Sequence, residues 1–265
     1  MTSNAKSAIV LAMKVSFVLG IILALSCCGK AEAKHCDKVP IKVAVIDTGF
    51  GYQDRGHDAP LCKYGHYDFS KEKQFSGAYD TRVPVPVDTH GHGTNIVGII
   101  NSYAKENHIN YCIVVIKYYS ERQTGHENLI AFIRAINYAA NIKVDYVNYS
   151  GGGPESDRVE KASVKRFLNG GGKMIAAAGN EHANLNIKEN AYYPAMYDKR
   201  IIVVGNLCKN GVRCESSNYG DAVTRWEVGE DVEAYGLTMT GTSQATAVAT
   251  GKILSESSNR CDIGF

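Results

Sequence analysis

Five short runs along the chain consist almost entirely of apolar residues, many of them β-branched, and polar or glycine-rich segments follow them. Continuous apolar runs of this length are typical of strands that are buried on both faces of a parallel sheet. We therefore predict strands over residues 41–46, 112–117, 144–149, 173–178 and 200–205.

Between these runs, apolar residues recur at helical spacing. The spacing predicts helices from Thr94 onward, over residues 127–140 and, as a shorter element, over residues 156–168. Because strands and helices alternate, we expect βαβ units and a mainly parallel sheet. Residues 50–87 show no clear periodicity, and Pro84 and Pro86 prevent a helix there, so we expect a long connection.

Composition and charge exclude some classes of function. The chain has 265 residues, of which 45% are hydrophobic and 21% are charged, and its formal net charge is +2. Lysines in the first 33 residues account for this excess, so the remainder is nearly neutral. We therefore expect no nucleic-acid partner and no binding to anionic membranes. Residues 34–265 are long enough for one domain with a complete core.

The N-terminal segment has the features of a secretory signal. Lys6 and Lys14 precede a short apolar run over residues 15–25, and Ala31-Glu32-Ala33 supplies small residues for a signal peptidase. The run is too short for a membrane span. We predict a signal peptide over residues 1–33 and an exported protein, either secreted or periplasmic. Residues 23–27 loosely resemble a bacterial lipoprotein processing site, so a lipid anchor at Cys27 is the alternative.

Six cysteines follow Ala33, and an even number after an export signal indicates disulfides. Cys208 and Cys214 flank a segment that contains Asn210-Gly211, a strong tight-turn signal, so we predict a local bridge between them. The other four allow three pairings, among which the sequence does not choose: Cys36, Cys62, Cys112 and Cys261. A zinc site is disfavoured because no Cys-x-x-Cys pair occurs.

Four polar residues follow predicted strands or begin predicted helices, in the order Asp47, His92, Asn180 and Ser243. Parallel sheets place such positions at one edge. Small residues after Ser243 favour a helix, so this serine lies at or near a helix N-terminus. A serine nucleophile needs a base, the base needs an acid that orients it, and the oxyanion needs hydrogen-bond donors. These four residues supply all of those parts.

Other interpretations of the same residues stay open. In the first alternative these residues have structural roles only. Asp47 would then cap a turn, His92 would lie exposed in a glycine-rich turn, and Ser243 would cap a packed helix. A metal-dependent hydrolase that uses Asp88, His90 and His92 is a second alternative. A third is a binding module that keeps the residues but not their catalytic geometry.

Several short motifs occur in one order along the chain, and together they carry a family resemblance. They are Val45-Ile46-Asp47-Thr48-Gly49, Gly91-His92-Gly93-Thr94, Ser150-Gly151-Gly152-Gly153-Pro154, Ala177-Ala178-Gly179-Asn180 and Gly241-Thr242-Ser243. In their order and spacing, the chain resembles the subtilisin-like serine proteases, peptidase family S8. The resemblance covers residues 41–252.

This resemblance implies an α/β three-layer sandwich with a mainly parallel central sheet between helices, and a monomeric serine endopeptidase. It implies that Asp47 orients His92, that His92 acts as general base and then acid, that Ser243 attacks the carbonyl, and that Asn180 stabilises the oxyanion. The partner is a protein or peptide substrate. The residues expected to bind it are Ser150, Gly151, Gly152, Ala177, Ala178 and Gly179. We expect no cofactor, and no metal because the family's calcium-binding loops are not recognisable.

The chain departs from the family's pattern beside the expected catalytic residues. Asn95 stands where the family usually has a second histidine, and Gln244 and Ala247 replace the usual methionine and proline after the serine. Because none of these donates a catalytic atom, we expect altered packing and retained activity. Gly151 replaces a larger apolar residue, which we expect to open the substrate pocket.

Overall fold

The computed structural model describes residues 39–51, 56–71, 84–106 and 108–257. The predicted signal peptide, the possible anchor at Cys27, and Cys36 and Cys261 lie outside these ranges. Within the described ranges, no helix has the length and apolar character that crossing a membrane requires.

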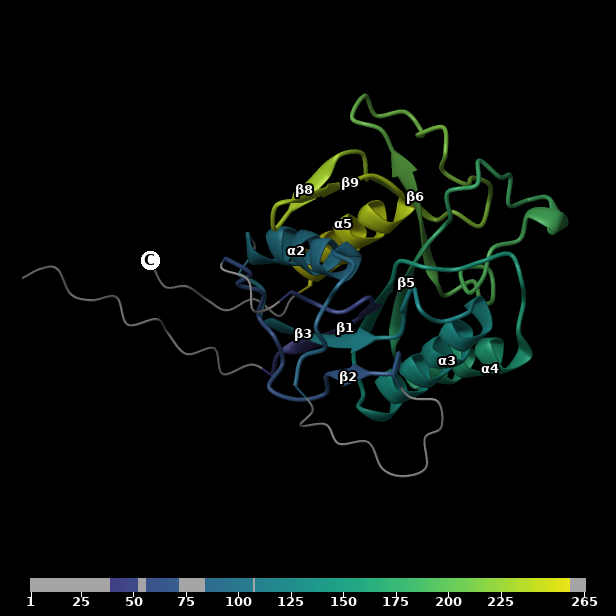
Figure 1. Cartoon of the computed structure of the whole chain (residues 1–265). Helices are drawn as coiled ribbons and strands as arrows, with labels where there is room; N and C mark the ends of the chain where they lie inside the picture. The colour runs from purple at the N-terminus through teal and green to yellow at the C-terminus, as the bar shows by residue number, and fades with distance from the viewer. Residues whose placement is uncertain (1–38, 52–55, 72–83, 107, 258–265) are drawn as a thin grey trace, which may run out of the picture. The chain divides into compact units, whose positions relative to one another are not determined.

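A seven-stranded sheet forms the centre of the described chain (Figure 1), and every neighbouring pair of its strands is parallel. The strand order is β2-β3-β1-β4-β5-β6-β7. The strands span Ile41–Asp47 (β1), Tyr67–Asp68 (β2), Tyr111–Lys117 (β3), Tyr146–Tyr149 (β4), Lys173–Ala177 (β5), Ile202–Leu207 (β6) and Arg225–Val228 (β7). A separate antiparallel hairpin joins β8 (Val232–Ala234) to β9 (Leu237–Met239).

Helices cover both faces of the sheet. On one face lie α2 (His92–Lys105) and α5 (Thr242–Ser255), and on the other lie α3 (Gly125–Asn141) and α4 (Arg158–Asn169) (Figure 1). A short 3₁₀ helix, η1, spans Lys188–Asn190. The predicted α/β fold of three layers with a mainly parallel sheet is confirmed.

The central strand β1 shows how the sequence produces these layers. Val43 and Val45 pack into the core that contains α2 and α5, whereas Ala44 and Ile46 pack into the core that contains α3 and α4. Successive strand residues point to opposite faces, so a strand between two helical layers must be apolar at every position. This requirement is the physical origin of the continuous apolar runs.

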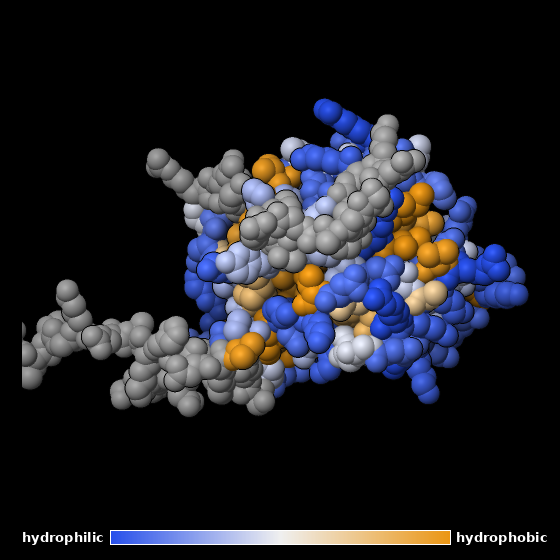
Figure 2. All heavy atoms as spheres, turned by 90° about the horizontal axis from the view of Figure 1, so that it is seen from below, coloured by the Kyte–Doolittle hydropathy of each residue, from blue (hydrophilic) through white to orange (hydrophobic). Residues whose placement is uncertain are grey.

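The surface carries both hydrophobic and hydrophilic residues (Figure 2). Figure 2 views the protein from below Figure 1 and shows orange hydrophobic patches separated by blue hydrophilic residues. Exposed apolar side chains include Val159 on α4 and Ile130 on α3. Single exposed apolar side chains of this kind are normal on soluble domains.

Two disulfides occur among the described residues. Cys208 is bonded to Cys214, the pair that the turn signal predicts. Cys62 is bonded to Cys112, which selects one of the pairings that the sequence left open. This second bridge joins the long connection to β3, where Cys62 N also donates a hydrogen bond to Ile113 O over 2.9 Å.

Candidate active site

Asp47 is the last residue of β1 and lies at the carboxyl edge of the sheet. Its side chain is buried, and its Oδ1 atom accepts hydrogen bonds from Thr48 N (2.7 Å) and from His92 Nδ1 (2.8 Å). The bond to Nδ1 fixes the orientation of the imidazole and leaves Nε2 as the ring nitrogen that faces other groups. The structure therefore brings Asp47 and His92 into direct contact, although 45 positions separate them along the chain.

His92 is the first residue of α2, and Asp88 determines how that helix begins. The N-cap residue Gly91 offers no side chain, and the Asp88 carboxylate takes its place by accepting hydrogen bonds from the backbone N–H groups of His90, Gly91 and Thr94, each at 2.9 Å. An acceptor at this position satisfies donors that a helix N-terminus otherwise leaves unpaired.

The same carboxylate also reaches the end of β1. Thr48 Oγ1 donates to Asp88 Oδ1 over 3.0 Å and accepts from Gly93 N over 2.8 Å. Burial raises the pKa of Asp88, but the hydrogen bonds from Thr94, Gly91 and His90 outweigh burial and hold the pKa below its usual value. Asp88 is thus an ionised structural group that links β1 to α2.

His92 has a shifted pKa for an identifiable reason. Burial lowers the pKa of the imidazole, but the negative charge of Asp47, its hydrogen bond and the more distant Asp88 outweigh burial, so the pKa lies above its ordinary value. The side chain is 22% exposed, so solvent or a ligand can reach it. A reachable imidazole beside a buried carboxylate is suited to accept and release a proton.

Ser243 lies in the first turn of α5, which follows the N-cap residue Gly241. Its Oγ atom donates a hydrogen bond to Ser150 O over 3.1 Å, and Ser150 Oγ donates to Ser243 O over 3.1 Å. Ser150 in turn lines a cavity of about 170 Å³ together with Asp47 and His92. Ser243 is thus bonded to Ser150, which lines the cavity around Asp47 and His92, and its hydroxyl donates to Ser150 O.

Asn180 follows β5 and lies at the N-terminus of α5. Its Oδ1 atom accepts a hydrogen bond from Thr242 N over 2.9 Å, which fixes the amide with its nitrogen on the other side. The residue as a whole is exposed to solvent. Asn180 thus lies beside the same helix end as Ser243.

The expected substrate-binding residues fall into two groups. Residues 150–153 continue from β4, and Gly153 exchanges backbone hydrogen bonds with Tyr193 at 2.8 and 2.9 Å. Gly152 and Gly153 line a cavity of about 480 Å³. In the second group, Ala177 and Ala178 are buried, and a side chain at Gly179 would collide with Asn218 and Glu181.

The expectation that Gly151 opens the pocket is wrong. A Cβ atom at Gly151 would lie 2.5 Å from Tyr118 Oη and 3.1 Å from Tyr149 Oη. Tyrosine side chains therefore occupy the space that a larger residue at position 151 would take. Tyr118 and Tyr119 line both cavities and were not identified as site residues from the sequence. Their position directly after the strand over 112–117 was the available signal.

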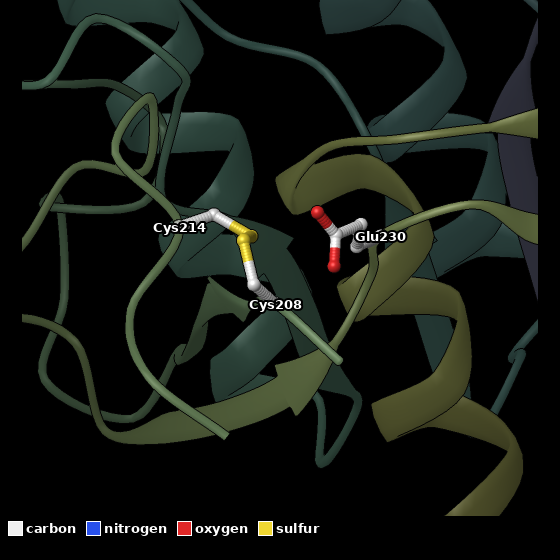
Figure 3. Close-up of side chains that lie close together, drawn as sticks. All are labelled: Cys208, Cys214 and Glu230. Carbon is white, nitrogen blue, oxygen red and sulfur yellow. A yellow bond between two sulfur atoms is a disulfide. The ribbon is translucent and has the colours of Figure 1, made fainter. Parts of the chain in front are cut away.

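The geometry argues against the metal alternative. Hydrogen-bond donors occupy both oxygens of Asp88, and His92 Nδ1 is bonded to Asp47. Among the described residues, the group of potential ligands whose atoms lie within 4.8 Å of one another is Cys208, Cys214 and Glu230. Figure 3 shows that both sulfurs of this group are consumed in the disulfide, so they are not available as thiolate ligands.

Comparisons with known proteins show the family of the chain. The model of the subtilase family matches residues 39–255. The major intracellular serine protease of Bacillus subtilis (strain 168) is 29% identical over 229 residues, which cover 80% of this chain and 67% of that protein. The intracellular serine protease of Paenibacillus polymyxa is 28% identical over 233 residues, which cover 80% of this chain and 65% of that protein. The chain thus spans about two thirds of the length of these relatives.

Solved structures show the same fold. A cold-adapted subtilisin-like serine proteinase superposes with a TM-score of 0.66 at 24% identity, and the match covers 83% of this chain and 76% of that chain. The epidermin leader peptide processing serine protease of Staphylococcus aureus gives a TM-score of 0.66 at 20% identity, with 83% of this chain and 65% of that chain covered. Since the family model matches most of the sequence, the chain belongs to the subtilase family.

Proposed function

We propose that this protein is a serine endopeptidase that uses Asp47, His92 and Ser243 as its catalytic triad and Asn180 as an oxyanion donor. The observation that carries the proposal is the 2.8 Å hydrogen bond between Asp47 Oδ1 and His92 Nδ1. It is supported by the position of Ser243 at the start of α5 and by relatives that are named serine proteases.

In this mechanism, Ser243 Oγ leaves Ser150 O by rotation about its side-chain bond and donates its proton to His92 Nε2. The serine attacks the substrate carbonyl, and the Asp47 carboxylate stabilises the imidazolium without taking a proton. The negative oxygen of the tetrahedral intermediate accepts hydrogen bonds from Asn180 Nδ2 and Ser243 N–H, the latter at a helix N-terminus. His92 then protonates the leaving amine, and a water molecule hydrolyses the acyl-enzyme by the same route.

Residues 150–152 are the proposed site of main-chain pairing with an extended peptide. An added strand of this kind binds through backbone hydrogen bonds, while pockets for its side chains give specificity. Ala177, Ala178 and Gly179 form the proposed wall for the side chain before the scissile bond.

Export is part of the proposal. The sequence features of residues 1–33 support a secretory signal, and the disulfides Cys62–Cys112 and Cys208–Cys214 suit an oxidising compartment. A related protein of Bacillus subtilis, 27% identical over 214 residues, is the minor extracellular protease Epr. We propose that the mature chain acts as a monomer outside the cytoplasm, and a lipid anchor at Cys27 remains the alternative form.

The decisive test compares Ser243→Ala with Ser102→Ala in peptide hydrolysis and fluorophosphonate labelling. Ser102 is a suitable control because it is an exposed serine on α2 whose hydroxyl bonds to Gly98 O within its own helix. We expect Ser243→Ala to lose activity by a factor on the order of 10⁶ and to lose all labelling, while Ser102→Ala keeps both.

Unchanged turnover in Ser243→Ala would overturn the proposal. A wild-type protein that neither labels nor hydrolyses peptides would instead favour the binding-module alternative. Loss of activity with a chelator, without any effect of the fluorophosphonate, would favour the metal-dependent hydrolase.

A further inference from the structure

The cavity of about 480 Å³ lies directly next to the proposed catalytic residues. Gly152 and Gly153 form part of its wall, immediately after Ser150. Tyr118 and Tyr119 line this cavity and also the smaller one around Asp47 and His92. A peptide that pairs with residues 150–152 therefore passes the mouth of the cavity, and one of its side chains can enter.

Glu160 is the unusual group in this cavity. It belongs to the first turn of α4, is only 4% exposed, and its Oε2 atom accepts a hydrogen bond from Tyr197 Oη over 2.6 Å. Burial raises the pKa of Glu160 to about 7; the bond from Tyr197 opposes this, and the charge of Asp157 adds to it. The groups that shift this pKa, burial, Tyr197 and Asp157, include no positive charge.

The rest of the lining suits a cation. Glu155 adds a second carboxylate. Among the described residues that line the cavity, none is a lysine or arginine, and His126 is the one side chain that can carry a positive charge. Tyr118, Tyr149 and Tyr193 contribute aromatic walls. Aromatic faces attract ammonium and guanidinium groups and pack against their apolar stems.

We propose that this cavity is a specificity pocket for a lysine or arginine side chain of the substrate, and that Glu160 is the residue that recognises its positive charge. The proposal rests on the proposed function, because it takes a peptide as the ligand. It adds to that function a selectivity that the catalytic residues themselves do not supply. In this buried position, the positive end of the substrate side chain replaces solvent around the Glu160 carboxylate. A neutral side chain cannot form this ion pair, so the pocket discriminates strongly against it.

The test measures binding in the Ser243→Ala background, so that no peptide is cleaved. Octapeptides carry either lysine or norleucine, which has a comparable apolar stem without charge, at each of the four positions before the expected scissile bond. Dissociation constants are measured by calorimetry at pH 8. At one position we expect lysine to bind roughly tenfold more tightly than norleucine, as a charge-assisted hydrogen bond predicts.

Glu160→Gln identifies the group responsible, and Glu106→Gln is its charge-matched control at the C-cap of α2. Glutamine keeps an oxygen that can accept the Tyr197 hydrogen bond. We expect Glu160→Gln to abolish the preference for lysine while norleucine peptides bind as before, and Glu106→Gln to keep the preference. Equal binding of the two peptides at all four positions, or an unchanged preference in Glu160→Gln, would overturn the inference.

A pH series keeps the inference testable even where Glu160→Gln does not fold. The titratable and charged groups that face Glu160 are Asp157, Tyr197 and Tyr149, together with Glu155 and His126 of the cavity. Because His126 is the histidine of this cavity lining, the series uses the His126→Asn variant, so that any pH dependence is not due to an imidazole at this position. We expect the ratio of the two dissociation constants to grow between pH 6 and pH 8 as Glu160 ionises, and a constant ratio contradicts the role of Glu160.

The two proposals can fail separately. Equal binding of lysine and norleucine peptides contradicts the pocket assignment and leaves the triad untouched. Turnover that survives the loss of Ser243 contradicts the triad and leaves the measured binding preference untouched.

Discussion

Gln244 Nε2 donates a hydrogen bond to Asn95 Oδ1 over 3.1 Å, although 149 positions separate the two residues along the chain. Both side chains are buried. Gln244 directly follows Ser243, and Asn95 lies three residues after His92. Asn95 Nδ2 also donates to Leu237 O over 2.7 Å. The two departures from the family pattern are therefore partners in one buried contact between α2 and α5, which agrees with the expectation of altered packing.

This contact predicts a specific stability effect. Asn95→Ala leaves the Gln244 amide and the carbonyl of Leu237 without their partners, so we expect the free energy of unfolding to fall by about 3 kcal/mol. Gln244→Met removes the amide itself, and in the double variant the cost should be less than the sum of the single costs by about 1–2 kcal/mol. Urea denaturation of the four proteins measures this coupling, and strictly additive costs would contradict it.

Asp47→Asn should change both the rate of hydrolysis and its dependence on pH. Burial lowers the pKa of His92 and the carboxylate of Asp47 raises it, with a net rise, so removing that charge must lower the pKa. Only the neutral imidazole accepts the serine proton. The acidic limb of kcat/KM should therefore move to lower pH, while the maximum falls by a factor on the order of 10⁴. A limb that stays in place or moves to higher pH contradicts the assignment of His92 as the base.

Two substitutions at Asn180 separate its proposed roles. Asn180→Ala removes both the acceptor for Thr242 N and the proposed oxyanion donor, so we expect lower stability and a kcat reduced by roughly 10²–10³. Asn180→Asp keeps the acceptor at the helix N-terminus but has no N–H to donate. It should retain stability and lose kcat at least as strongly. Normal kcat in Asn180→Asp would show that the amide nitrogen does not act on the oxyanion.

The two disulfides should differ in their contribution to stability. Cys62 and Cys112 are 50 positions apart, whereas Cys208 and Cys214 are 6 apart. Closing a longer loop removes more conformational entropy from the unfolded chain, so replacing the first pair by alanine should cost about 4 kcal/mol and the second about 2 kcal/mol. Chemical denaturation of the two double variants, with the parent protein as reference, shows which disulfide contributes more to the free energy of unfolding. The reverse order would contradict the entropic explanation.

Sequence patterns predicted the central strands well because each of these strands must be apolar on both sides. The predicted ranges 41–46 and 112–117 differ from β1 and β3 by one residue at one end of each. In contrast, β2, β8 and β9 have two or three residues each, which is too short for any periodicity. The hairpin of β8 and β9 depends on its packing against α2, a tertiary contact that no local pattern contains.

For the candidate site, the sequence likewise predicted the positions of residues along the sheet edge but not the contacts of their side chains. The sequence indicated that Asp47 and His92 share one edge of the sheet, because the order of strands and helices determines that edge. It did not indicate that Tyr118 fills the space beside Gly151 or that Ser243 Oγ bonds to Ser150 O. Both depend on side-chain rotamers, which respond to neighbours that are far apart along the chain.

Asp88 donates nothing to the proposed reaction, yet its carboxylate joins the residue that follows Asp47 to the turn that presents His92. The alignment of the proposed acid and base thus depends on a third carboxylate, which the proposed mechanism does not use. A defect at this position would misalign both members of the proposed pair at once, while every atom of the proposed reaction was still present. An inventory of reactive side chains therefore understates how many positions a working enzyme of this kind depends on.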